Sequence, residues 1–97
     1  MNIAAEFNDN ICVLRPQGRI DTLTAPEVET AVTENAAKCG RLVLDMAEVD
    51  YVSSAGIRVI VRAYQLMGKD GFSLRNVSKN VMQLLKMTGF DKVLCFE

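Results

Sequence analysis

Residues 47–58, Ala-Glu-Val-Asp-Tyr-Val-Ser-Ser-Ala-Gly-Ile-Arg, join a buried-type strand to a long apolar helix. The strand is predicted over 41–46, and the helix is predicted to start at Ser54 and to run to about Lys69. Amide groups at a helix start lack intrahelical acceptors and carry partial positive charge, so an oxygen or a phosphate is favourable there. From the residues alone, Ser54 is either a helix cap or a phosphorylation switch.

The amino-terminal part of the chain is predicted to form a hairpin followed by a helix. Strands over 3–7 and 11–15 flank the turn residues 8–10, and Pro-Gln-Gly at 16–18 is expected to end the second strand. A Thr24-x-x-Glu27 capping box starts the helix, which is expected to end at Gly40.

The carboxy-terminal part is predicted to contain a strand over 72–76 and a helix capped by Ser78 and stopped by Gly89. A last strand or extended tail covers 92–96. Met82 and Met87 are interpreted as core or edge residues. The resulting order, β-β-α-β-α-β-α-β, predicts an α/β fold. We expect a single domain over residues 1–97, with packed helices and a mixed, mostly parallel sheet whose first strand is antiparallel.

The composition of the chain argues against binding of nucleic acid and against insertion into a membrane. The net charge is −1 and the charged residues are interspersed, so no basic stripe for nucleic acid is visible. No apolar run approaches the roughly 18 residues of a membrane span, and the first twenty residues lack a signal-peptide core. The three cysteines are far apart and are expected to be reduced, buried thiols of a cytoplasmic protein.

The absence of histidine removes the Ser-His and Cys-His nucleophile pairs and the usual zinc ligands. There is also no phosphate-binding loop or Gly-x-Gly-x-x-Gly motif. We therefore expect no enzyme activity, no metal and no cofactor.

Two motifs carry a resemblance to a known family. Residues 18–25 read Gly-Arg-Ile-Asp-Thr-Leu-Thr-Ala, and residues 44–57 read Leu-Asp-Met-Ala-Glu-Val-Asp-Tyr-Val-Ser-Ser-Ala-Gly-Ile. They are similar to the Gly-x-Leu/Ile-Asp-x-x-Thr/Ser-Ala and Leu-Asp/Asn-Leu-x-x-Val-x-Phe/Tyr-Ile/Met-Asp-Ser-Ser/Ala-Gly-Leu motifs of STAS domains, as in bacterial anti-sigma factor antagonists. The order of predicted elements also fits that fold over the whole chain.

The resemblance implies a phosphorylation-controlled partner switch. In family antagonists a serine of the second motif is phosphorylated by an anti-sigma factor serine kinase, and its position here is Ser54. The family's preceding acidic residue is replaced by Ser53, which makes Ser53 the alternative site. The unphosphorylated protein would bind the kinase, and a PP2C-type phosphatase is a second candidate partner. The alternative function is a non-phosphorylated scaffold or accessory subunit of a multi-protein or transporter complex.

The partner is expected to cover the loop that contains Asp21 and the start of the Ser54 helix. The predicted contact residues are Asp21, Thr22, Ser53, Ser54, Ala55, Gly56, Ile57 and Arg58.

Several of these positions also have a structural interpretation. Asp21 is typical of turn chemistry. Gly56 permits close packing of the helix start and, compatibly with this, could leave the serine open to a kinase. Asp45 and Asp50 are expected to repel a phosphate on Ser54, although Asp45 could instead satisfy loop amides. The stripe Arg58, Arg62 and Lys69 is either a solvated face or a surface for an acidic partner.

Overall fold

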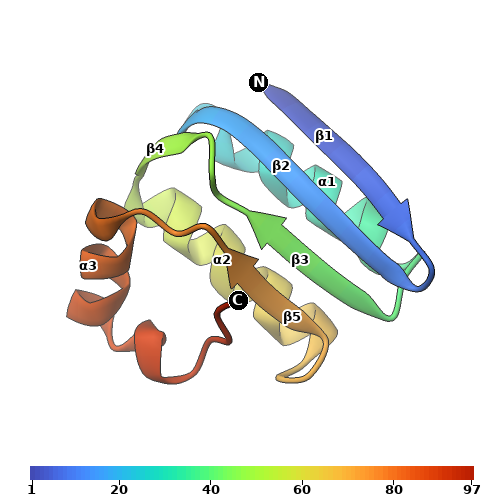
Figure 1. Ribbon diagram of the computed structural model, residues 1–97. Helices are drawn as coiled ribbons and strands as arrows, with labels where there is room; N and C mark the ends of the chain where they lie inside the picture. Colours follow the sequence, from blue (N-terminus) through green and yellow to red (C-terminus); the bar gives the residue numbers. More distant parts are fainter.

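The computed structural model describes residues Met1–Glu97. They form a mixed five-stranded sheet, and helices cover one of its two faces (Figure 1). The strands are β1 (Asn2–Asn8), β2 (Ile11–Ile20), β3 (Arg41–Asp45), β4 (Val49–Val52) and β5 (Phe72–Arg75). The helices are α1 (Ala25–Ala36), α2 (Ser54–Met67), α3 (Lys79–Thr88) and the short 3₁₀ helix η1 (Phe90–Lys92). The pair β1–β2 is antiparallel and all other pairs are parallel, which confirms the predicted fold class.

The alternation of side chains gives the sheet two different faces. One face packs against α1 and α2 and holds the apolar core, including Cys12, Leu14, Leu42, Leu44, Phe72 and Leu74. The opposite face has no helix over it (Figure 1) and carries charged side chains. Helix α3 lies beside β4, at the end of the sheet where α2 begins.

The second strand is longer than the sequence predicts. β2 continues through Pro16 to Ile20 because it changes partner on one side, pairing with β3 over Ile11–Leu14 and with β4 over Gly18–Ile20. Pro16 lies between these two stretches, so its missing N–H leaves no bond unmade in either parallel ladder. The register shifts after Gly18, whose φ of 101° requires glycine.

Strand β4 is absent from the sequence prediction, which treats the segment after Asp45 as a loop. It is only four residues long, and only Val49 and Val52 are buried, so its pattern is too short to indicate a strand. The last predicted strand is reduced to an extended tail with one bridge, between Leu74 and Phe96.

Helix ends agree with the sequence at α3 and differ at α1. Ser78 caps α3 by accepting a hydrogen bond from the Val81 N–H at 3.2 Å, and Gly89 ends it in the left-handed conformation. Helix α1 ends at Ala36 instead of Gly40, because the Gly40 N–H is bonded to Asn10 in the β1–β2 turn. Among the cysteines only Cys12 is buried, so the expectation of three buried thiols is wrong.

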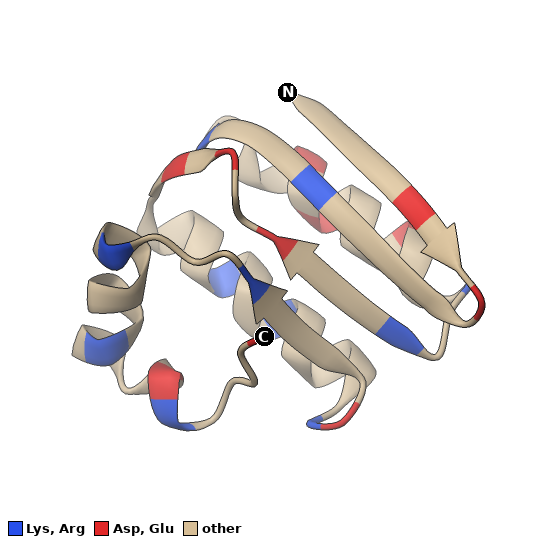
Figure 2. Ribbon diagram, viewed as in Figure 1, with Lys and Arg blue, Asp and Glu red and all other residues tan.

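Acidic and basic residues lie on different helices (Figure 2). Helix α1 carries three glutamates and no basic residue, whereas α2 carries two arginines and α3 two lysines, with no acidic residue in either. No helix has the combination of length and hydrophobicity that a membrane span requires.

Candidate functional site at the start of helix α2

The two serines at the start of α2 have different roles. Ser53 is the N-cap, and its Oγ accepts a hydrogen bond from the Gly56 N–H at 3.4 Å. Ser54 is the first residue of the helix; its side chain is exposed, and its hydroxyl makes no hydrogen bond within the protein. The interpretation of Ser54 as the cap is therefore wrong, and its oxygen is free to react or to bind.

Gly56 permits close packing of α2 on the sheet. A Cβ at this position would lie 2.5 Å from Val52 Cγ1 and 2.9 Å from Ile20 Cγ2. Both distances are shorter than a van der Waals contact between carbon atoms. A side chain there would meet Val52 and Ile20, which confirms the packing role of this glycine, while its effect on access of a kinase to Ser54 stays a prediction. The neighbouring Ile57 is also largely buried, at 7% exposed.

The loop between β2 and α1 is organised by Asp21. Its Oδ1 accepts hydrogen bonds from the Leu23 N–H at 3.0 Å and the Thr24 N–H at 3.1 Å. The Thr24 N–H, joined by the other donors and by Arg19, holds the pKa of Asp21 below its ordinary value. The Thr24 hydroxyl donates to the Arg19 carbonyl at 2.6 Å, so the predicted Thr24–Glu27 capping box does not form. Asp21 thus has the turn role that the sequence offered.

The structure brings this loop against the start of α2. Thr22, Ala55 and Arg58 line one hollow of about 240 Å³ together with the first turn of α1. Arg58 also lines a second hollow with Ser54 and Ile57. Both segments of the predicted contact surface, the loop at Thr22 and the start of α2, therefore meet around the Arg58 side chain, which has no ion-pair partner.

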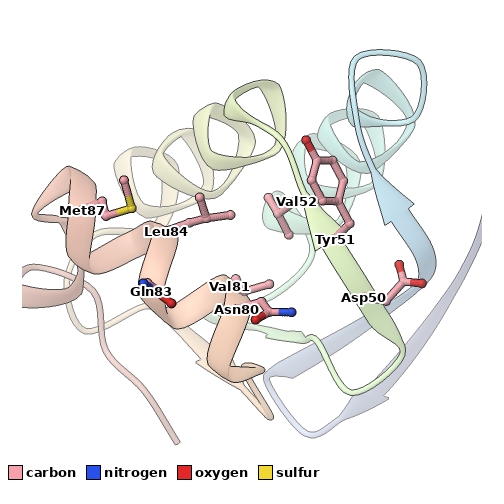
Figure 3. Close-up of a pocket in the computed structure, with 8 residues that line it drawn as sticks. All are labelled: Asp50, Tyr51, Val52, Asn80, Val81, Gln83, Leu84 and Met87. Carbon is pink, nitrogen blue, oxygen red and sulfur yellow. The ribbon is translucent and has the colours of Figure 1, made fainter.

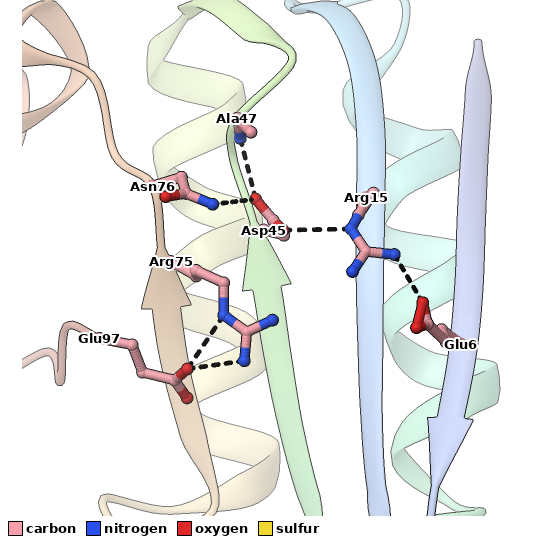
Figure 4. A network of polar contacts seen from close by, with 7 residues as sticks. All are labelled: Glu6, Arg15, Asp45, Ala47, Arg75, Asn76 and Glu97. Carbon is pink, nitrogen blue, oxygen red and sulfur yellow. Dashed lines mark hydrogen bonds and ion pairs between the residues drawn. The ribbon is translucent and has the colours of Figure 1, made fainter.

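Asp45 does not belong to this site. Its side chain lies on the helix-free face of the sheet (Figure 4), is 5% exposed, and accepts hydrogen bonds from three donors. The donors are Ala47 N–H at 3.0 Å, Asn76 Nδ2 at 3.1 Å and Arg15 Nε at 3.1 Å. Burial would raise the pKa of Asp45, but these bonds outweigh burial and hold the pKa below its ordinary value. The alternative role of Asp45 in satisfying a loop amide is confirmed, and repulsion between its carboxylate and a phosphate on Ser54 stays a prediction.

A groove between β4 and α3 was missed by the sequence analysis. It has a volume of about 300 Å³ (Figure 3) and is lined by Asp50, Tyr51, Val52, Asn80, Val81, Gln83, Leu84 and Met87. A second hollow of about 200 Å³ shares Val52, Leu84 and Met87 with it and extends to Ser53 and Ser54. We call the two hollows together the β4–α3 groove.

Met87 is the residue from which this groove could have been inferred in the sequence. The sequence analysis places it in the core or at its edge, yet it is 77% exposed. Met87 stands two residues before the Gly89 stop and one turn after Leu84, so these two apolar residues both lie on the side of α3 toward β4.

Comparison with known proteins gives a consistent result over the full chain. The STAS domain family model matches residues 2–97. The anti-sigma-B factor antagonist of Bacillus subtilis (strain 168) is 26% identical over 97% of this chain and 88% of its own length. The protein of the same name from Listeria monocytogenes is 30% identical over the same shares. The crystal structure of an anti-sigma factor antagonist from Mycobacterium paratuberculosis superposes with a TM-score of 0.89 at 28% identity, covering 98% of this chain and 83% of that chain. Anti-sigma factor antagonists are regulators without enzyme activity, in agreement with the expectation from the sequence.

Proposed function

Because the chain belongs to the STAS domain family, we propose that it is a cytoplasmic anti-sigma factor antagonist controlled by phosphorylation of Ser54. The observation that carries this proposal is the state of the Ser54 hydroxyl. It is exposed and unbonded at the first position of α2, while the capping task is performed by Ser53. A serine that has no structural task can be modified without loss of the fold.

The start of α2 can accept a phosphate where it stands. Transfer of the γ-phosphoryl group of ATP to Ser54 Oγ releases the hydroxyl proton and adds about −1.5 to −2 charges near neutral pH. The free amide groups of the first turn and the helix dipole favour this charge. Arg58 follows one turn later at the i+4 position, and α2 contains no acidic residue. We therefore expect a local change of charge and little change in backbone structure.

The partner is a kinase-type anti-sigma factor that binds the unphosphorylated protein and thereby releases its sigma factor. It contacts Asp21, Thr22 and the segment Ser53–Arg58, with Gly56 available only through its backbone. Phosphorylation places a dianion in this contact surface. The complex then dissociates, because burying a charge without a matched partner at an interface costs free energy. A PP2C-type phosphatase would restore the binding form.

The modification is tested by incubating the protein with its cognate kinase and ATP and mapping the site by fragmentation mass spectrometry. We expect phosphate on Ser54 in the wild type and in Ser53→Ala, and none in Ser54→Ala, which should bind the kinase permanently. Phosphate on Ser53 alone would contradict the assignment. Stable binding with no phosphate on either serine would favour the scaffold or accessory-subunit alternative.

The contact surface is tested by hydrogen exchange with and without the kinase. Protection is expected over residues 21–25 and 53–58. Arg58→Glu should reduce affinity while the melting temperature stays unchanged, since Arg58 is exposed and unpaired. Protection that excludes both segments would place the partner elsewhere.

A further inference from the structure

We propose that the β4–α3 groove receives an apolar side chain of the protein partner, and that a basic residue beside this side chain pairs with Asp50. This inference rests on the proposed function and extends the contact surface from the start of α2 to α3. It also states the chemistry that the partner must present.

The groove offers apolar surface to solvent. Its floor is formed by the buried residues Val52 and Val81, and its rim by Leu84, Tyr51 at 41% exposed and Met87 at 77% exposed (Figure 3). Methionine and tyrosine provide large contact area, and a solvent-exposed methionine at a hollow is typical of binding surfaces that adapt to a partner.

The charges around the groove select the kind of partner. Asp50 is the one charged residue in its lining; it is exposed and has no ion-pair partner. The two lysines of α3, Lys79 and Lys86, line a separate hollow with Met82. Arg19 lies over the Tyr51 ring, 4.3 Å from its centroid, but it is not part of the lining and pairs with Asp21. A nucleotide or another anion would therefore meet a carboxylate and no cation among the lining residues. An apolar group accompanied by a positive charge is the complement of this lining.

The groove is connected to the proposed switch. Its second hollow is lined by Val52, Leu84 and Met87 together with Ser54, so a side chain seated there contacts the serine. A phosphate on Ser54 would place about two negative charges at that end of an apolar groove. Because burying such a charge against apolar groups is unfavourable, phosphorylation removes the partner from the groove as well as from the start of α2.

The test uses the kinase-type anti-sigma factor that phosphorylates Ser54 in the experiment above, with binding measured by titration calorimetry. Met87→Glu and Asp50→Lys should each weaken binding by about tenfold or more. Leu66→Glu is the matched control, since Leu66 is an apolar residue of α2 that is 44% exposed and does not line the groove. It should change the dissociation constant by less than about twofold, and circular dichroism should show that all three variants are folded.

The chemistry of the occupant is tested by a photo-crosslinking residue at position 87. We expect crosslinks to an apolar stretch of the kinase within one helical turn of a lysine or arginine. Changing that basic residue to glutamate should restore binding to Asp50→Lys.

Each failure has a distinct meaning. If no kinase-type anti-sigma factor binds the wild type, the proposed function and this inference both fail. If the wild type binds and both groove variants bind equally well, the inference is wrong and the proposed function stands. Crosslinks to a second copy of this chain, or a small apolar ligand found by native mass spectrometry, would also overturn it.

Discussion

The helix-free face of the sheet and the end of the molecule around Ser54 both carry polar groups. Those on the sheet face are hydrogen-bonded within the protein, whereas some of those around Ser54 are not. On the sheet face, Asp45 is buried and bonded to three donors (Figure 4). Glu97 there accepts hydrogen bonds from Ser73 Oγ at 2.7 Å and Arg75 Nη2 at 2.8 Å. At the other end, the Ser54 hydroxyl and the Asp50 carboxylate are exposed and have no protein partner.

This difference separates stability from binding. A charge can be buried only if its hydrogen bonds are satisfied, so the complete network around Asp45 indicates a structural role. Polar and apolar groups that remain unpaired at the surface contribute little to folding and are available to a partner. We expect substitutions to affect unfolding in the first region and affinity in the second.

The largest effect is expected when the two aspartates are compared. Asp45→Ala removes the acceptor of three donors and should lower the free energy of unfolding by about 3 kcal/mol in urea titrations. Asp50→Ala should change it by less than about 0.5 kcal/mol. Binding should show the reverse order, with a weaker complex for Asp50→Ala only. Equal stabilities of the two variants would remove the basis for separating the two regions.

The next effect concerns Ser54→Glu. A carboxylate at the first position of α2 faces the helix dipole and Arg58, so stability should be unchanged or higher by about 0.3–1 kcal/mol. Affinity for the kinase should fall about tenfold to a hundredfold, or about 1.4–2.8 kcal/mol. Thermal unfolding and calorimetry measure the two quantities. Ser54→Gln is the control of similar size without charge, and an equal loss of affinity there would show that size, not charge, disrupts the complex.

A smaller effect distinguishes the adjacent serines. Ser53→Ala removes the helix cap and should cost about 0.5–2 kcal/mol, toward the lower end because the bond to Gly56 is 3.4 Å long. Ser54→Ala should cost less than about 0.5 kcal/mol. Urea unfolding of the two variants measures this difference. A greater loss of stability in Ser54→Ala would mean that Ser54 has a structural task and would weaken its assignment as the switch.

The smallest effect is the contribution of Asp45 to acid sensitivity. Its pKa is lower in the folded protein than the ordinary value of 3.8, so the folded state binds fewer protons than the unfolded chain. The stabilisation is therefore present above the ordinary value and is lost as the pH falls through the lowered one. Asp45→Asn should be less stable than the wild type near pH 6 and should lose less stability on going to about pH 3. Parallel stability curves for the two proteins would contradict this.

The revised role of Asp21 changes how its variants are interpreted. If Asp21 were only an exposed contact residue, Asp21→Ala would weaken partner binding and leave the melting temperature unchanged. Because the carboxylate accepts bonds from the Leu23 and Thr24 amides, this variant should also lower the melting temperature. Arg58→Glu is the better probe of the same surface.

The class of fold, the two motifs and the place of Ser54 at the start of a helix could be predicted from the amino-acid sequence. Alternating strand and helix patterns, the turn residues at 8–10 and the end signals around Ser78 and Gly89 are local properties, so they can be predicted from neighbouring residues. Sequence resemblance was sufficient to identify the family, because its two motifs lie in contiguous segments.

Which long-range polar contacts form, and which polar groups stay free, depends on how distant segments pack together. Asp45 lies on the helix-free face, where Arg15 and Asn76 reach it from distant parts of the chain. Strand β4 pairs with the second half of β2, beyond the residues of β2 that pair with β3. The groove lies between β4 and α3, which packs beside that strand. These outcomes depend on contacts between segments about 30 residues apart in the chain, which no local pattern of hydrophobicity encodes.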